Sequence, residues 1–312
     1  MSFAAIFPGQ GSQSVGMLAE LAASNDAVAD TLKEASAALG FDLAQMMLEG
    51  PAEELNRTEN TQPALLAAGV AAWRAWQAAG GPEPVACAGH SLGEYTALVV
   101  AGVMDFDAAL KLVRLRGQAM QEAVPAGSGA MAAVLGLDAE TVIRLCKDVS
   151  DTGIVSAANL NAPEQIVIAG EQAAVEDATR RAGEAGAKRV VPLAVSAPSH
   201  CALMAPAAER LAAALEGLEL RPPRIPVINN ADVAAPGDAA AIRDALTRQL
   251  TQPVRWVEVV GALKCEYGAS QLVEFGPGRV LAGLMRRIDR ELKAWPVYDA
   301  ASLDAALAAV NQ

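Results

Sequence analysis

The chain has 312 residues, 53% of them hydrophobic and 4% aromatic, so it can bury a large core and can divide into one large and one small unit. Its formal net charge of -12 argues against nucleic acid as a partner, because binding phosphates requires clustered lysine and arginine. No apolar run approaches the ~18 residues that span a bilayer, and the four cysteines form no C-x-x-C pair, so we expect a cytoplasmic protein without membrane contact or a metal site.

Strands and helices alternate along the first part of the chain. A predicted strand over residues 3–7 leads into a glycine loop over residues 8–13, and a helix is expected to start near Val15. The loop lacks the pattern of a Walker or dinucleotide loop, but it can aim backbone N–H groups at an anion above the first strand. Further elements are expected over residues 27–39, 62–79, 94–103 and 107–123 as helices and over residues 84–88 as a buried strand.

The pattern changes after a glycine-rich linker at residues 125–129. Strands are predicted over residues 130–135, 154–159, 165–169 and 189–195, with helices over residues 138–148 and 171–185. This βαββαβ order is that of a ferredoxin-like unit. We therefore predict a small ferredoxin-like domain over residues 127–196, inserted into a large domain formed by residues 1–126 and 197–312.

Longer connections return in the last part of the chain. Helices are predicted over residues 206–218, 242–250 and 254–261, strands over residues 227–229 and 271–275, and a final helix that carries Arg286 and Arg287. Strands that alternate with helices favour a parallel sheet covered on both faces. The expected fold class is therefore α/β, with a hydrolase-like parallel-sheet core and the small inserted domain.

The sequence Gly89-His90-Ser91-Leu92-Gly93 fits the G-x-S-x-G pattern of a nucleophile elbow. In such an elbow the serine lies on a sharp turn between a strand and a helix, and both elements are predicted here on either side of the motif. The pattern also arises by chance in glycine-rich chains, but the strand-turn-helix setting favours a catalytic serine. Ser91 is therefore the candidate nucleophile.

A serine hydroxyl needs a base within hydrogen-bond reach, usually an imidazole. The chain contains only two histidines, His90 and His200. Adjacent residues at a tight turn generally point in different directions, so we expect the fold to bring His200 to Ser91. The acidic residue nearest to His200 is Glu209, so a carbonyl oxygen is a candidate to orient the imidazole.

Arg116 interrupts an apolar stripe on the predicted helix over residues 107–123. Its neighbours one turn away are Leu112, Val113, Ala119 and Met120. A charged group held there needs an anion, and an internal carboxylate could serve as a purely structural partner. If Ser91 is catalytic, the planar guanidinium is instead suited to a bidentate bond with a substrate carboxylate.

A tetrahedral intermediate also requires an oxyanion hole. In elbow enzymes one donor is the backbone N–H of the residue after the serine, here Leu92. The second donor comes from a neighbouring loop, and Gln10 in the opening glycine loop is the candidate.

Taken together, these residues resemble those of a family, the malonyl-CoA:acyl carrier protein transacylases together with the acyltransferase domains of fatty acid and polyketide synthases. The resemblance covers essentially the whole chain. Its motifs are Phe7-Pro8-Gly9-Gln10-Gly11-Ser12-Gln13, Thr61-Gln62-Pro63-Ala64-Leu65, Gly89-His90-Ser91-Leu92-Gly93-Glu94, Arg116-Gly117-Gln118-Ala119-Met120, Asn159-Leu160-Asn161-Ala162-Pro163-Glu164-Gln165, Ser199-His200 and Glu274-Phe275-Gly276-Pro277-Gly278.

The resemblance implies a role for each candidate residue. Ser91 is implied as the acylated nucleophile, His200 as the base, and Arg116 as the clamp on the malonyl carboxylate. It also implies oxyanion amides at Gln10 and Leu92, a backbone carbonyl at Gln249 that orients His200, and pocket contacts at Asn161 and Gln62.

The reaction implied is ping-pong transfer of a malonyl group from malonyl-CoA to the phosphopantetheine thiol of acyl carrier protein, for fatty acid or polyketide synthesis. No permanently bound cofactor is expected, and a monomer is the default. Because carrier proteins are acidic, docking is expected on basic residues such as Arg279, Arg286 and Arg287. The main alternative is a serine thioesterase or esterase that releases the acyl group to water, and a non-catalytic carrier-binding protein is another.

Overall fold

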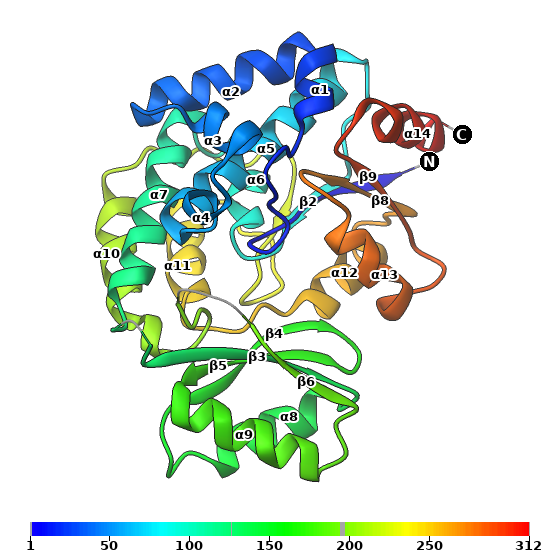
Figure 1. Cartoon of the computed structure of the whole chain (residues 1–312). Coiled ribbons are helices and arrows are strands. Elements are labelled where there is room, and N and C mark those ends of the chain that lie inside the picture. The colour runs from blue at the N-terminus through cyan, green and yellow to red at the C-terminus, as the bar shows by residue number, and fades with distance from the viewer. Residues whose placement is uncertain (1, 126, 194–196, 312) are drawn as a thin grey trace.

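Two β-sheets organise the chain, a parallel sheet in the larger part and an antiparallel sheet in the smaller part (Figure 1). The computed structural model describes residues 2–125, 127–193 and 197–311. The predicted domain limits at residues 126 and 196 lie outside these ranges, so the division into residues 127–196 and the remainder stays a prediction.

The parallel sheet forms the centre of the larger part. It has five strands in the order β7-β2-β1-β8-β9, and every neighbouring pair is parallel. The strands are β1 (Phe3–Phe7), β2 (Ala86–Gly89), β7 (Val227–Ile228), β8 (Gln271–Phe275) and β9 (Lys293–Val297). This arrangement confirms the predicted parallel-sheet core.

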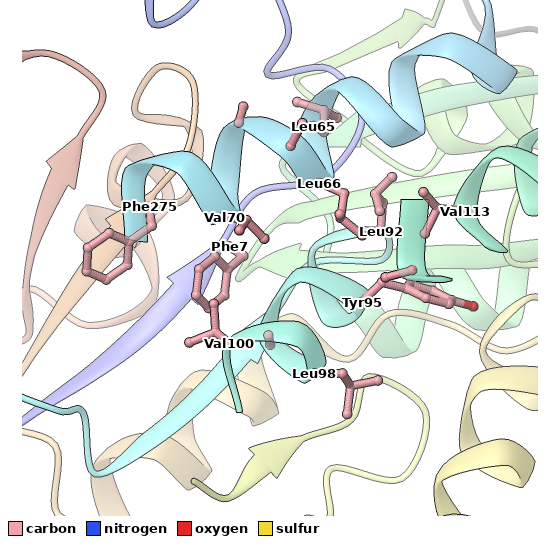
Figure 2. Close-up of a cluster of buried hydrophobic side chains, with 14 of the residues drawn as sticks. Phe7, Leu65, Leu66, Val70, Leu92, Tyr95, Leu98, Val100, Val113 and Phe275 are labelled. Atoms are coloured by element: carbon pink, nitrogen blue, oxygen red, sulfur yellow. The ribbon is translucent and has the colours of Figure 1, made fainter. Parts of the chain in front are cut away.

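Helices cover both faces of the parallel sheet. Along β1, Phe3, Ala5 and Phe7 pack into the larger core, whereas Ala4 and Ile6 pack into a second core on the opposite face. Such alternation is expected of a strand buried on both sides. Figure 2 shows part of the larger core, where Phe7 of β1 lies between Val70 of α5 and Val100 of α6.

The helices of the larger part divide between these two cores. The larger core is formed with α1 (Ala19–Ser24), α2 (Asp26–Leu39), α3 (Leu43–Glu49), α4 (Ala52–Leu55), α5 (Thr58–Ala78), α6 (Gly93–Val100), α7 (Phe106–Glu122), α10 (Ala205–Glu216), α11 (Ala239–Gln249) and α14 (Ala300–Val310). The second core is formed with α12 (Trp256–Cys265) and α13 (Val280–Ile288).

The antiparallel sheet has the strand order β4-β5-β3-β6. Its elements are β3 (Gly129–Leu135), α8 (Ala139–Asp148), β4 (Val155–Ala162), β5 (Gln165–Glu171), α9 (Gln172–Glu184) and β6 (Arg189–Pro192). The chain order is therefore βαββαβ, as predicted. Helices α8 and α9 cover the face that points away from the larger part, so the other face of the sheet is turned toward it (Figure 1).

Several predicted boundaries are wrong. The first helix begins at Ala19 rather than near Val15, because Gly16 and Leu18 take left-handed backbone conformations with φ of 85° and 60°. The helix predicted from residue 254 begins at Trp256, because the backbone of Val254 is hydrogen-bonded to β4. The sequence patterns also missed α3, α4, β9 and α14.

All four cysteines are free, and Cys265 is exposed whereas the other three are buried. No helix in the described part of the chain is long and apolar enough to cross a membrane.

Candidate active site

The turn at Ser91 has the geometry of a nucleophile elbow. Ser91 lies between β2 and α6 with φ of 50°, which is strained for a residue with a side chain. A Cβ atom on Gly89 would lie 1.9 Å from the backbone carbon of Gly93, and one on Gly93 would lie 2.0 Å from the carbonyl oxygen of Phe7. Both glycines are therefore required for the close packing of the strand, the turn and the helix.

The fold brings His200 to the serine. Ser91 Oγ and His200 Nε2 are 2.7 Å apart, and His200 Nδ1 is 2.8 Å from the carbonyl oxygen of Gln249. Since that oxygen can only accept, Nδ1 carries the proton and Nε2 is free to accept the proton of Ser91. Burial, followed by the nearby Arg116 charge, lowers the pKa of His200 to about 3, so the imidazole is neutral at neutral pH.

Arg116 of α7 reaches the serine from the other side. Its side chain is 1% exposed, and Nη2 donates to Ser91 Oγ at 3.2 Å and to Gln249 Oε1 at 3.1 Å. Nη1 donates to Gln62 Oε1 at 2.8 Å, and Nε has no hydrogen-bond partner in the described structure. A buried guanidinium with neutral partners can bind an incoming carboxylate.

Gln10 and Leu92 both line the pocket above Ser91. Within the described residues, neither backbone N–H donates to another group of the protein. The Gln10 side chain is held in place by a bond from Nε2 to Thr58 Oγ1 of 3.2 Å. The two amides are therefore available to an oxyanion, as the position of Leu92 at the start of α6 allows.

The pocket has a volume of about 110 Å³ and lies between the two sheets. From the larger part it is lined by Ser91, His200 and Arg116, and from the smaller part by Met131, Asn159 and Leu193. It therefore has space for a small acyl group.

Asn161 and Gln62 lie behind the pocket wall and do not line it. Asn161 Oδ1 is 2.7 Å from His90 Nε2, and Gln62 holds Arg116. His90, the other histidine, thus faces Asn161 rather than the serine hydroxyl, and its ring lies 5.6 Å from that of Trp256.

The sequence patterns missed two residues that support the elbow. Asn230 follows β7, and its Oδ1 accepts the backbone N–H of Ser91 at 2.7 Å. Glu94 follows the elbow on α6, and its carboxylate accepts bonds from Asn230 and from Gln249. Asn230 lies outside every motif quoted above. Glu94 belongs to the elbow motif and is 2% exposed. An acidic residue within an apolar predicted helix is a signal that could have identified Glu94 as a supporting residue.

No group of three or more His, Cys, Asp or Glu side chains within the described ranges is placed to hold a metal ion. The chemistry that the site can perform rests on its own groups. They are a serine hydroxyl activated by a neutral imidazole, two free amides at the position of an oxyanion, and a cation beside the serine. These features on a parallel α/β sheet define a serine-dependent acyl-transfer enzyme.

Comparison with known proteins gives the family. The sequence model of the acyl transferase domain family matches residues 5–300, and the chain belongs to this family. It is 54% identical over 305 residues to the malonyl CoA-acyl carrier protein transacylase of Salmonella typhimurium, with 98% of each chain covered. The corresponding Escherichia coli protein is 53% identical over the same length, again with 98% of each chain covered.

Solved structures agree with these relatives. An acyl carrier protein S-malonyltransferase from Vibrio cholerae matches with a TM-score of 0.96 and 56% identity over 98% of this chain and 100% of that one. A malonyl-transacylase in complex with a type II PKS acyl-carrier protein matches with a TM-score of 0.97 and 57% identity, over 99% of this chain and 100% of that one. The chain is thus an acyltransferase, and the predicted family and fold class are confirmed.

Proposed function

We propose that this enzyme transfers a malonyl group from malonyl-CoA to the phosphopantetheine thiol of acyl carrier protein, through a malonyl ester on Ser91. The observation that carries the proposal is the placement of Arg116 against the nucleophile, with 3.2 Å between Nη2 and Ser91 Oγ. An acyl group bonded to that oxygen has its far carboxylate within reach of the guanidinium. The names of the relatives support the same donor and acceptor.

In the first half-reaction Ser91 Oγ attacks the thioester carbon as His200 Nε2 takes its proton. The backbone N–H groups of Gln10 and Leu92 stabilise the negative oxygen of the tetrahedral intermediate. The carbon–sulfur bond then breaks, and the imidazolium returns the proton to the sulfur of CoA. The malonyl group is left on Ser91 as an ester.

In the second half-reaction the thiol of the carrier's phosphopantetheine gives its proton to His200 and attacks the ester. The carbon–oxygen bond breaks, and Ser91 Oγ recovers the proton. The carbonyl of Gln249 holds the imidazole in the same tautomer throughout, at 2.8 Å from Nδ1. Both substrates bring their own thioester or thiol, so the proposed steps use no permanently bound cofactor.

Arg116 favours an acyl group that carries a carboxylate over the neutral acyl group of an ordinary esterase substrate. An esterase for neutral acyl groups has no need of a buried cation beside the serine, and burying one is unfavourable without a partner. The carboxylate of malonate supplies that partner. Gln62 and Asn161 act from behind the wall in this scheme, Gln62 by holding Arg116 and Asn161 by holding His90.

The carrier protein is proposed to dock at a basic groove between the small sheet and α13. The groove has a volume of about 480 Å³. Its cations are Lys188, Arg189, Arg286, Arg287 and Arg290, and its one acidic lining residue, Glu164, pairs with Lys188 at 2.8 Å. It includes two of the three arginines expected from the sequence, while Arg279 lies outside its lining. Clustered cations on an acidic chain give an acidic partner a local site of opposite charge.

The decisive experiment is the intact-protein mass of the native chain and of Ser91→Ala after brief exposure to malonyl-CoA alone. The proposal expects a malonyl-sized adduct on the native chain only, which added carrier protein discharges. An adduct that decays equally fast without carrier would support the esterase instead. No adduct on the native chain would contradict the proposal.

The discharge step of the same assay, in which carrier protein removes the malonyl group from Ser91, tests the docking groove. Reversing both charges in Arg286→Glu with Arg287→Glu should leave the malonyl adduct intact and slow its discharge by carrier protein. Discharge at the native rate would exclude the groove as the docking site.

A further inference from the structure

Glu94 is a buried carboxylate that no step of the proposed reaction uses. It is 2% exposed on α6, directly behind the elbow, and it forms no ion pair within the described residues. Burial raises its pKa to about 7, although the bonds from Gln249 and Asn230 and the charge of Arg116 oppose that rise. A carboxylate kept in such surroundings is unfavourable unless its hydrogen bonds stabilise something else.

The two hydrogen bonds that the Glu94 carboxylate accepts converge on one oxygen. Oε2 accepts Nε2 of Gln249 at 2.8 Å and the backbone N–H of Asn230 at 2.8 Å. These donors come from two segments that are distant from α6 in the sequence, the end of α11 and the loop after β7. One carboxylate oxygen therefore holds two segments of the larger part against the elbow.

The Asn230 branch reaches the nucleophile. Asn230 Oδ1 accepts the backbone N–H of Ser91 at 2.7 Å, and Nδ2 donates to the carbonyl of Gly89 at 2.7 Å. The asparagine therefore satisfies the backbone on both sides of the strained turn, while Glu94 fixes the asparagine backbone.

The Gln249 branch reaches the base and the cation. The side-chain amide of Gln249 donates to Glu94 through Nε2 and accepts from Arg116 Nη2 through Oε1 at 3.1 Å. An acceptor on one side and a donor on the other permit only one orientation of this amide. The backbone carbonyl of the same residue orients His200.

We propose that Glu94 is a positioning residue for acylation, whose acceptor oxygen fixes Gln249 and Asn230 and through them the alignment of Arg116 with Ser91. This inference rests on the proposed function of the same site. It concerns the geometry of the oxygen and not its charge. Shortening the side chain should therefore be more harmful than neutralising it.

Two substitutions separate geometry from charge. Glu94→Gln keeps the length and one acceptor oxygen, whereas Glu94→Asp keeps the charge and withdraws the oxygen by one methylene group. Glu274→Asp is the matched control, because Glu274 is also a buried carboxylate with a pKa raised by burial to about 7, and it accepts only from α13. Neither of these hydrogen bonds involves a residue around Ser91.

The measurement is the rate of Ser91 acylation by malonyl-CoA and by acetyl-CoA, followed by intact-protein mass. Glu94→Asp should slow malonylation about 10- to 100-fold, the usual effect of losing hydrogen bonds that hold a charged group. The preference for malonyl over acetyl should shrink as well, since only malonyl uses Arg116. Glu94→Gln should stay close to the native rate and preference.

A merely structural role for Glu94 predicts lower thermal stability with an unchanged preference, as expected for Glu274→Asp, and that result would overturn the proposal. An equal loss of acylation rate in Glu94→Gln and Glu94→Asp would also overturn it. If Glu94→Asp does not fold, a slow acylation rate in Glu94→Gln alone would overturn the proposal. Labelling of Ser91 by a fluorophosphonate gives a readout that needs no acyl donor. A native chain that is labelled but not malonylated would refute the proposed function, and slower labelling of Glu94→Asp would still support the positioning role.

Discussion

Arg116 is the residue whose contact with the substrate should decide the choice of acyl group. Its charge is buried against a tyrosine ring 5.3 Å away, and its hydrogen-bond acceptors are neutral side chains. Burial accordingly lowers the pKa of its guanidinium. A substrate carboxylate would supply a negatively charged acceptor, which none of these hydrogen-bond partners is, so the free energy gained on binding should be larger for malonyl than for acetyl groups.

Arg116→Ala should therefore reduce kcat/KM for Ser91 malonylation by about 10- to 100-fold, as expected for loss of a charge-assisted hydrogen bond. Acetylation should change less. Arg114→Ala is the control on the same helix, because its guanidinium stacks on Phe41 at 4.5 Å and lies outside the pocket lining. Equal losses for both acyl groups in Arg116→Ala would contradict a carboxylate clamp.

The two histidines give a pH prediction that spectroscopy can follow residue by residue. Burial lowers the pKa of both imidazoles, with that of His200 at about 3. Since protonation is favoured in the unfolded chain, where the pKa is near 6.5, these histidines lower the free energy of unfolding as the pH falls below 6.5.

In the folded enzyme we expect no protonation of the His200 imidazole between pH 8 and 5. Long-range ¹H–¹⁵N spectra should show the neutral ring with Nδ1 protonated across this range. A titration centred near the ordinary histidine pKa of ~6.5 would contradict the burial and the hydrogen bond to Gln249 on which the proposed base depends.

At the scale of the element, the strand-turn-helix unit around Ser91 depends on close backbone contact. Gly93 lies where β1 and α6 touch, and the atom that an added methyl group would meet is the carbonyl oxygen of Phe7, which cannot move aside without disturbing β1. Gly283 differs, because it lies inside α13 with no atom within 4 Å of the added position.

Gly93→Ala should lower the thermal unfolding midpoint and abolish acylation, since overpacking against backbone costs about 1–3 kcal/mol or more. Gly283→Ala should instead raise the midpoint slightly, because the better helix propensity of alanine adds about 0.5–1 kcal/mol to the free energy of unfolding. Calorimetry on the two variants checks both signs. Similar changes in the two variants would show that helix propensity, and not the contact with Phe7, governs Gly93.

At the scale of the whole molecule, β4 joins the small sheet to the larger part. Leu160 N donates to Val254 O and Val254 N donates to Ala158 O, each at 2.9 Å. The bond between Asn161 and His90 adds a link from the same strand to the elbow. The pocket is completed by residues from both sides of this junction, so catalysis should depend on how firmly the two parts are joined.

Asn161→Ala should lower kcat for acylation with little change in KM, because Asn161 holds His90 and lies outside the pocket lining. The loss of one buried hydrogen bond should also destabilise the enzyme by about 1 kcal/mol. Steady-state kinetics separate the two roles considered for this residue. A raised KM with unchanged kcat would instead support direct contact with the substrate.

The features that could be predicted from the amino-acid sequence are those whose signals are local. The glycines around Ser91, the strand before it and the helix after it are neighbours in the chain, so their pattern is visible without a fold. The scarcity of histidine singled out His200, and the apolar stripe around Arg116 marked it as unusual. The βαββαβ order of the small unit could be predicted because each element is set by its own periodicity.

The groups that support the site become visible only once the chain is folded. Asn230 bonds to Glu94 across 136 positions and to Ser91 across 139, and Gln249 bonds to Glu94 across 155. No local pattern distinguishes these polar side chains from solvated ones, because their role depends on burial at the point where β2, β7 and α11 meet. The boundaries at Val15 and Val254 were wrong for the related reason that contacts outside each segment set its backbone.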